Sequence, residues 1–423
     1  MKILKRATLV LFLAFSAIKP SASHAQGSLT PPGAPAPTMK TLDQIETRRP
    51  ISGLPYTINT PGSYYVTTNL LVAVNDGIVI TANNVTLDLN GFTISSIQNS
   101  TTHGKAIALG SGSGPVSNIT IRNGFITGDV TNNGATFGGS GFGYGIFQFG
   151  GQPPSNVRVS GVTVSGCLYV GIHLGGSNTV VESCCVNTAG SYGIYAQSIS
   201  GSTAVNCGSY GIYATDRAND CSGAGIINGS GVFAVIANNC RGTGSGSGSG
   251  VIATTANNCF GDALGSGAGL SCRTANNCNG TSSSGSGIAA TTAINCSGSS
   301  TSGSGISATT AQSCSGSSGS GNGIYTTTAI NCSGSGSGGI YASTALNCNG
   351  SSSSQSGTGI YVTSAQNCYG SSSKYGIGIY AMSSAIGCFG SSFGDTGMYA
   401  FIANSCHGTG PTPSQFEHNV NSF

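Results

Sequence analysis

The chain has 423 residues, and only 6% of them are Asp, Glu, Lys or Arg, where ordinary domains carry roughly 25%. Its 14 basic and 11 acidic residues give a net charge of +3, which excludes a strongly basic surface for nucleic acid or anionic membranes. Intrinsic disorder is excluded as well, because disordered chains combine high charge with few apolar residues, and 38% of this chain is hydrophobic.

Residues 1–25 have the features of a secretory signal peptide. Lys2 and Lys5 precede an apolar stretch at 7–18, and Ser23-His24-Ala25 is a typical cleavage triplet. The stretch is too short to span a bilayer, and no later segment is long and apolar enough to form a transmembrane helix. We therefore expect a secreted protein that is extracellular, at the cell surface or periplasmic. Cleavage would lower the net charge to about −1.

Residues 26–55 contain a Pro-rich linker followed by a predicted short amphipathic helix. Met39, Leu42 and Ile45 fall on one side of that helix. Because the first coil of a stack exposes unpaired strand edges, we expect the helix to cover that end. A plain linker is the alternative interpretation.

One short sequence motif repeats through residues 191–410. Gly250-Val251-Ile252-Ala253-Thr254-Thr255-Ala256-Asn257-Asn258-Cys259 returns almost unchanged as 287–296 and again in later copies. Successive repeat cysteines lie 16 to 20 residues apart, a period that indicates a solenoid. The repeat cysteines are Cys221, Cys240, Cys259, Cys278, Cys296, Cys314, Cys332, Cys348, Cys368, Cys388 and Cys406.

Residues 56–190 carry a longer version of the same pattern. Gly77-Ile78 and Asn84-Val85-Thr86-Leu87 are examples of its two strands. Each unit is rich in Ile, Val, Thr and Tyr with period-two alternation and ends in Gly-Ser tracts that would break a helix. The sequence therefore predicts an all-β, right-handed parallel β-helix of about 16 short coils with a small N-terminal cap. Residues 411–423 form a C-terminal tail that either covers the last coil or is loose.

The entry coils resemble those of the pectate-lyase-like, right-handed parallel β-helix superfamily, and in particular its secreted bacterial β-helix repeat proteins. The residues that carry this likeness are Pro61-Gly62-Ser63-Tyr64-Tyr65-Val66, Asp76-Gly77-Ile78 and Asn84-Val85-Thr86-Leu87-Asp88-Leu89-Asn90-Gly91. These motifs are architectural, so the resemblance implies the fold and says little about chemistry.

The cysteines recur once per coil, which predicts a ladder inside the stack. In-register side chains point the same way and approach one another poorly for a disulfide, so we expect mostly reduced thiols that pack as small hydrophobes. A linear ladder offers no tetrahedral pocket for zinc, and His173, His407 and His418 lie far apart in sequence. We expect no metal site and no cofactor.

The position between the inward Ile and the inward Ala of each copy holds an aromatic residue in many coils. Period-two alternation places these rings outside, as a strip suited to binding sugars. The alternative is that neighbouring rings only stabilise adjacent strands. The candidate ligand-binding residues are Tyr325, Tyr341, Tyr361, Tyr380 and Tyr399.

Acidic residues are too scattered to predict a catalytic pair. No charged residue occurs between Arg273 and Lys374, and general acid–base chemistry needs two groups near one bond. Only Asp216 and Asp220 concentrate charge, as a weak alternative site for calcium or a sugar, and a solvated turn with a local ion pair is the favoured interpretation.

These patterns favour a non-catalytic β-helix rod that is adhesin-like or carbohydrate-binding, with an extracellular polysaccharide or cell-surface glycan as partner. A polysaccharide lyase or glycoside hydrolase is the alternative function. Ice binding through rows such as Thr254-Thr255 is a minor third interpretation. We expect a monomer.

Overall fold

The computed structural model describes residues 47–98, 104–110, 114–148 and 153–423, and those from Arg48 onward form one unit. The predicted signal peptide and the predicted capping helix lie outside the described residues. The described residues contain strands and turns but no helix, and none of them forms a helix able to cross a membrane.

The first part of the described chain forms long, irregular coils. Its strands are β1 (Arg49–Ile51), β2 (Tyr56–Ile58), β3 (Gly62–Val66), β4 (Leu70–Val72), β5 (Ile78–Ile80), β6 (Val85–Asp88), β7 (Thr93–Ser96), β8 (Lys105–Leu109), β9 (Ser117–Thr127), β10 (Thr131–Asn132), β11 (Phe137–Gly138), β12 (Tyr144–Gln148), β13 (Ser155–Cys167), β14 (Val170–His173), β15 (Thr179–Glu182) and β16 (Cys185–Ala189). Here β10 and β11 form a separate antiparallel pair.

The later coils are shorter, and each has one long and one short strand. The long strands are β17 (Tyr192–Ser200), β19 (Tyr210–Asn219), β21 (Ser230–Asn238), β23 (Val251–Asn257), β25 (Leu270–Asn276), β27 (Ile288–Ile294), β29 (Ile306–Gln312), β31 (Asn322–Ile330), β36 (Ile360–Gln366), β38 (Ile379–Ile386), β40 (Met398–Asn404) and β42 (Gln415–Val420), with one long strand split into β33 (Gly338–Tyr341) and β34 (Thr344–Leu346).

The short strands form the opposite wall of the same coils. They are β18 (Thr203–Cys207), β20 (Ser222–Gly225), β22 (Arg241–Gly244), β24 (Phe260–Ala263), β26 (Asn279–Ser282), β28 (Ser297–Ser300), β30 (Ser315–Ser318), β32 (Ser333–Gly336), β35 (Asn349–Ser352), β37 (Tyr369–Ser372), β39 (Phe389–Ser392) and β41 (His407–Thr409).

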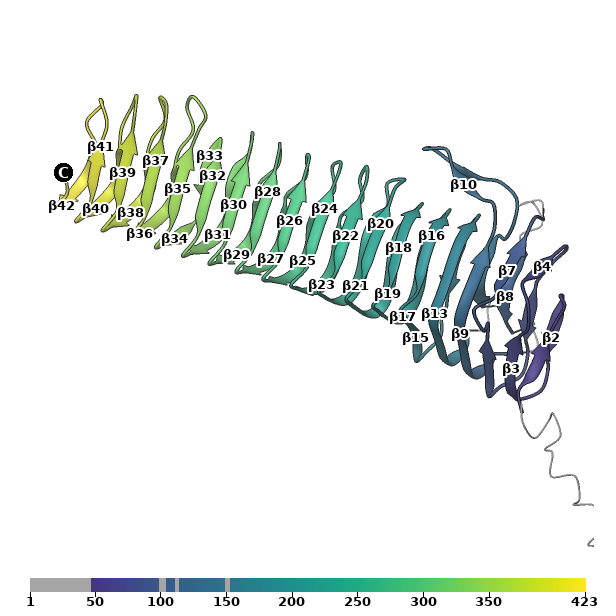
Figure 1. Cartoon of the computed structure of the whole chain (residues 1–423). Helices are drawn as coiled ribbons and strands as arrows, with labels where there is room; N and C mark the ends of the chain where they lie inside the picture. Colours follow the sequence, from purple (N-terminus) through teal and green to yellow (C-terminus); the bar gives the residue numbers. More distant parts are fainter. Residues whose placement is uncertain (1–46, 99–103, 111–113, 149–152) are drawn as a thin grey trace, which may run out of the picture. The chain divides into compact units, whose positions relative to one another are not determined.

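Apart from β10 and β11, each strand pairs in parallel with its counterpart in the next coil, so the chain is a right-handed parallel β-solenoid, as predicted (Figure 1). It has about 19 turns, against the about 16 expected. The expected number was low because it was counted between Gly77 and Cys406, whereas β1 already pairs with β3 and β42 pairs with β40. Strand β1 lies within the range assigned to the linker, and β42 shows that residues of the tail cover the last coil.

The interior of a regular coil is slim and apolar. In the coil of β27 and β28, Ile288, Ala293 and Cys296 are buried. The two walls approach so closely at glycine that a Cβ atom added to Gly298 would lie 2.2 Å from the carbonyl oxygen of Gly305. Only glycine fits at this column, because any side chain would collide with the facing backbone.

A left-handed residue turns the chain between the two walls. The residue before each repeat cysteine has a positive φ, for example 54° at Asn295. Asn tolerates this conformation better than most residues with a Cβ. The recurring Asn-Cys pair is therefore a corner followed by an inward side chain.

The corner conformation predicts different effects for two substitutions of Asn295. Asn295→Ala should lower the free energy of unfolding by about 1 kcal/mol, because in the left-handed conformation the Cβ of alanine lies too close to the following carbonyl oxygen. Asn295→Gly should cost clearly less, since glycine adopts positive φ freely. Denaturant titration of both variants checks this, and an equal loss for Ala and Gly would contradict the role assigned to the corner.

Candidate ligand-binding surface

The five candidate tyrosines lie one above another on the long-strand wall. Register pairs join Tyr325 to Tyr341, Tyr341 to Tyr361, Tyr361 to Tyr380, and Tyr380 to Tyr399. The preceding residue, such as Ile340, is buried, whereas Tyr341 is 40% exposed. Period-two alternation thus places the rings outside, in what we call the tyrosine ladder.

The rings of the tyrosine ladder stack on one another. Neighbouring centroids are 4.7 to 5.1 Å apart, and the ring planes differ by 3 to 16°. Each inner ring therefore uses both faces against its neighbours. A ligand can reach the ring edges and hydroxyl groups, whereas it cannot stack on the faces of the inner rings.

A hollow of about 250 Å³ lies beside the middle of the tyrosine ladder. Tyr341 and Tyr361 line it together with the polar residues Asn322, Ser337 and Thr358. These amide and hydroxyl groups offer both donors and acceptors, as do the phenol groups. The hollow therefore combines ring edges with hydrogen-bonding groups.

The C-terminal end of the tyrosine ladder meets an acidic residue. The hydroxyl of Tyr399 donates a hydrogen bond of 3.3 Å to Oε1 of Glu417 in β42. The negative charge of Glu417 raises the pKa of Tyr399, with a smaller contribution from desolvation. The folded tail thus contributes a carboxylate to this end of the ladder.

A second aromatic ladder occupies the same register position in earlier coils. It runs through Phe147, His173, Tyr195, Tyr213 and Phe233, with neighbouring centroids 4.4 to 5.0 Å apart. Desolvation lowers the pKa of His173, which favours a neutral ring in the stack. Four coils with smaller side chains separate the two ladders, at Ile252, Ser271, Ala289 and Ser307.

The two acidic residues considered as an alternative site each have a structural partner. Asp216 pairs with Arg217 at 3.5 Å. Asp220 is a left-handed corner residue that accepts a hydrogen bond from Asn239. Each carboxylate thus has a local structural partner, and no group of three or more potential metal ligands occurs among the described residues.

A buried ion cluster near the first coils was not anticipated. Asp88 is 6% exposed and pairs with Arg122 at 3.0 Å and with Arg48 at 3.7 Å. Asn123 also donates to it. The sequence pattern could have predicted this ion pair, because Asp88 follows the inward Leu87 of its strand and Arg122 occupies the same position one coil later. The cluster joins successive coils, and its carboxylate is fully engaged.

Threonines form another column that repeats more regularly than the sequence alone indicated. Thr255, Thr274, Thr292, Thr310, Thr328 and Thr344 are in register. The neighbouring exposed position is interrupted by Arg273, so the two columns do not form an unbroken array.

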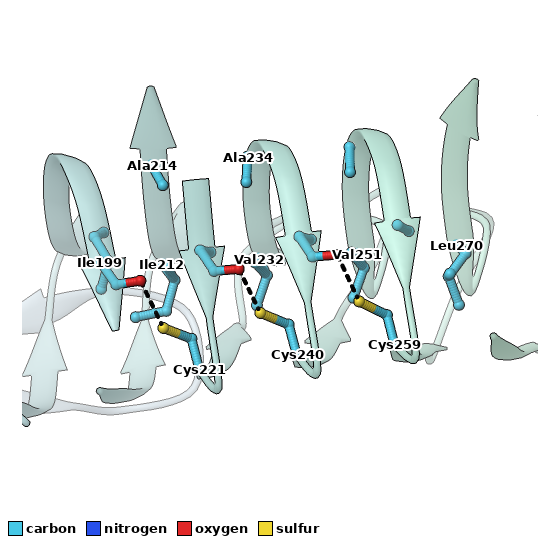
Figure 2. Packing of buried hydrophobic residues seen from close by; sticks show 14 of the residues in the cluster. Ile199, Ile212, Ala214, Cys221, Val232, Ala234, Cys240, Val251, Cys259 and Leu270 are labelled. Carbon is cyan, nitrogen blue, oxygen red and sulfur yellow. Dashed lines mark hydrogen bonds between the residues drawn. The ribbon is translucent and has the colours of Figure 1, made fainter. Parts of the chain in front are cut away.

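The eleven repeat cysteines are free and buried inside the solenoid. Figure 2 shows three of them, Cys221, Cys240 and Cys259, pointing into the apolar interior from successive coils. The sulfur of Cys240 lies 3.3 Å from the carbonyl oxygen of Ala218 and 3.2 Å from that of Asn238. Its single proton can be donated to either, so the thiol is satisfied without a disulfide.

A shallow groove of about 630 Å³ runs over part of this thiol ladder. The cysteines among its lining residues are each only about 3% exposed. Asn and Ser side chains from the flanking positions form its two sides. The cysteines in the groove are Cys278, Cys296, Cys314 and Cys332.

Comparisons with known proteins add little to this picture. No family model matches the chain, and no curated protein matches it significantly. Among solved structures, the A-module of the mannuronan C-5 epimerase AlgE6 from Azotobacter vinelandii is similar over 86% of this chain and 90% of its own, with 13% identity and a TM-score of 0.26. A likeness this weak carries no information about chemistry, so the interpretation depends on the geometry of the coils.

The buried thiols predict slow chemical modification. The native mature protein should react poorly with a bulky aromatic disulfide reagent, whereas the denatured protein should expose nearly all 16 cysteines. Colorimetric thiol counting before and after denaturation checks this. If most thiols prove to be oxidised in protein collected from outside the cell, the reduced ladder is refuted.

Stability should fall at alkaline pH. Burial raises the pKa of Cys167 and Cys207 to about 12. The stability that these two buried thiols contribute to the folded state is therefore complete below the unfolded pKa near 9, and it is lost as pH rises toward 12. Within that window, each thiol should lower the free energy of unfolding by about 1.4 kcal/mol per pH unit. Melting temperatures measured from pH 8 to 11 should decline less steeply for a Cys167→Ala, Cys207→Ala variant. Parallel pH profiles would contradict this assignment.

Proposed function

We propose that this protein is a non-catalytic, secreted or cell-surface β-solenoid that binds an extended extracellular polysaccharide or cell-surface glycan along the tyrosine ladder. The observation that carries the proposal is the constant spacing of five outward phenol groups beside a hollow lined by amide and hydroxyl groups. A repeating polymer can meet the same groups at successive rungs.

The chemistry of recognition follows from the stacking of the rings. Because the faces of the inner rings are covered, the ligand would meet C–H edges and hydroxyl groups. A phenol hydroxyl both donates and accepts, which suits the hydroxyl groups of a neutral sugar. Each such hydrogen bond contributes about 1 kcal/mol, so several rungs are needed for useful affinity. The ladder supplies five rungs. The hydroxyl of Tyr399 already donates to Glu417 and that of Tyr361 to the sulfur of Met382, so these two rungs are left to accept.

The charge distribution favours binding over cleavage. Tyr325, Tyr341 and Tyr361 lie in the segment between Arg273 and Lys374, which contains no charged residue. Cleavage of a glycosidic bond by acid–base chemistry requires a pair of carboxyl groups flanking it. Near Tyr399, Glu417 is a single carboxylate engaged by the tyrosine hydroxyl.

The decisive variant is Tyr341→Phe, Tyr361→Phe, Tyr380→Phe, which keeps the stacked rings and removes three hydroxyl groups. Losing about 3 kcal/mol of hydrogen bonding should weaken glycan binding more than a hundredfold, with the melting temperature nearly unchanged. The corresponding triple Ala variant should lose binding and also some stability, because stacked rings contribute about 1 kcal/mol per pair. Binding to a polysaccharide array is the measurement.

The second aromatic ladder provides the matched control. Tyr195→Phe, Tyr213→Phe makes the same chemical change outside the proposed site, so this variant should bind as the parent does. If the triple Phe variant also binds as the parent does, the tyrosine ladder is structural and the proposal fails. Product analysis on the same array tests the alternative, since release of shorter or unsaturated sugars would identify a hydrolase or lyase.

A further inference from the structure

The thiol ladder places one sulfur directly above another through eleven coils. The backbone register shows this, because Asn279 donates to the carbonyl of Cys259 and Ser297 donates to that of Cys278. The sulfur of Cys278 also lies 3.4 Å from the backbone nitrogen of Cys259. Adjacent parallel strands are about 4.8 Å apart, so neighbouring sulfurs repeat at about that interval.

This interval matches a linear bridge between two thiolates. A metal–thiolate bond measures about 2.3 Å, so two bonds in line span about 4.6 Å, close to the strand spacing of about 4.8 Å. The cysteine side chains stand roughly perpendicular to the sheet. The bond from sulfur to a metal on the stacking axis would then lie roughly at a right angle to the Cβ–S bond, which is a normal geometry for a thiolate.

We propose that the thiol ladder is a binding site for soft divalent cations that prefer two-coordinate, linear thiolate ligation, with Hg(II) as the representative ion. Each ion bridges the sulfurs of two adjacent cysteines. A tetrahedral ion such as Zn²⁺ is not accommodated, because no three potential ligands converge among the described residues.

The charge of the bound state favours a divalent ion. Two thiol S–H bonds break, two protons leave to solvent and two S–metal bonds form, without any change of oxidation state. The product is a neutral bis-thiolate. Between Arg273 and Lys374 no charged side chain could compensate a buried ion, and an uncompensated buried charge is costly. A monovalent soft cation would leave one negative charge and should bind more weakly.

Each sulfur takes part in one bridge only. A second ion on the opposite side would require the sulfur to bond in a straight line, which its lone pairs disfavour. The eleven cysteines therefore form five pairs, with one thiol left over. The groove runs along the outer side of Cys278, Cys296, Cys314 and Cys332. Because these residues are only about 3% exposed, a bulky thiol reagent cannot reach their sulfurs.

The parent protein is first titrated with Hg(II) at neutral pH. We expect about five tightly bound ions per chain, two protons released per ion, and an X-ray absorption spectrum showing two sulfur neighbours at about 2.3 Å. Circular dichroism should remain unchanged, and the melting temperature should rise because the ions bind the folded state. Sites with three or four sulfurs would overturn the proposal.

Two variants with equal numbers of thiols then test adjacency. The alternating variant replaces every second rung by Ala, at Cys240, Cys278, Cys314, Cys348 and Cys388. The contiguous variant replaces five neighbouring rungs, at Cys221, Cys240, Cys259, Cys278 and Cys296. Each retains six ladder thiols, but adjacency predicts no bridging ion in the alternating variant and three in the contiguous variant.

Equal binding by the two variants would overturn the proposal, since it would show that the ions bind individual thiols. Cys272→Ala is the control outside the ladder and should leave five ions bound. If the alternating variant does not fold, the proposal is tested on the parent protein, by the number of sulfur atoms bound to each ion and the number of protons released per ion. A single sulfur per ion, or one proton per ion, would then refute the linear bridge.

Discussion

The close approach of two glycine columns is the constraint on which the regular coils depend. Gly298 of the short-strand wall faces Gly305 of the long-strand wall at a distance that excludes a Cβ atom. The two walls can lie this close only because neither carries a side chain there. The interior that remains is narrow, and it is filled by one Ile, one or two Ala and one Cys from each coil.

A narrow interior limits what each coil can contribute to stability. Ala and Cys bury little apolar surface, so no coil could fold alone. The rest of the stabilising free energy must come from contacts between coils. These are the parallel backbone hydrogen bonds and the packing of each side chain against its copies above and below. Identical residues therefore meet across coils, which turns a repeated sequence into ladders of Asn, Ser, Tyr and Cys.

These ladders give the protein chemical groups at a constant spacing along the stack. On the outside, phenol groups repeat at about 5 Å with their ring faces covered, and inside, thiols repeat at the strand spacing. Both proposed activities derive from that periodicity rather than from a pocket that gathers residues from distant segments.

The sequence by itself determined the β-solenoid, the inward and outward positions of each copy and the cysteine ladder, because a repeat near 19 residues with period-two alternation admits few other folds. It underestimated the number of turns, since β1 and β42 lack the repeated motif. Only the tertiary structure decided that the tyrosine faces cover one another, that Asp88 joins Arg122 across coils and that Asp216 and Asp220 have separate partners. The reason is that alternation fixes which wall a side chain leaves from, whereas its contacts depend on the register and rotamers of the coils above and below.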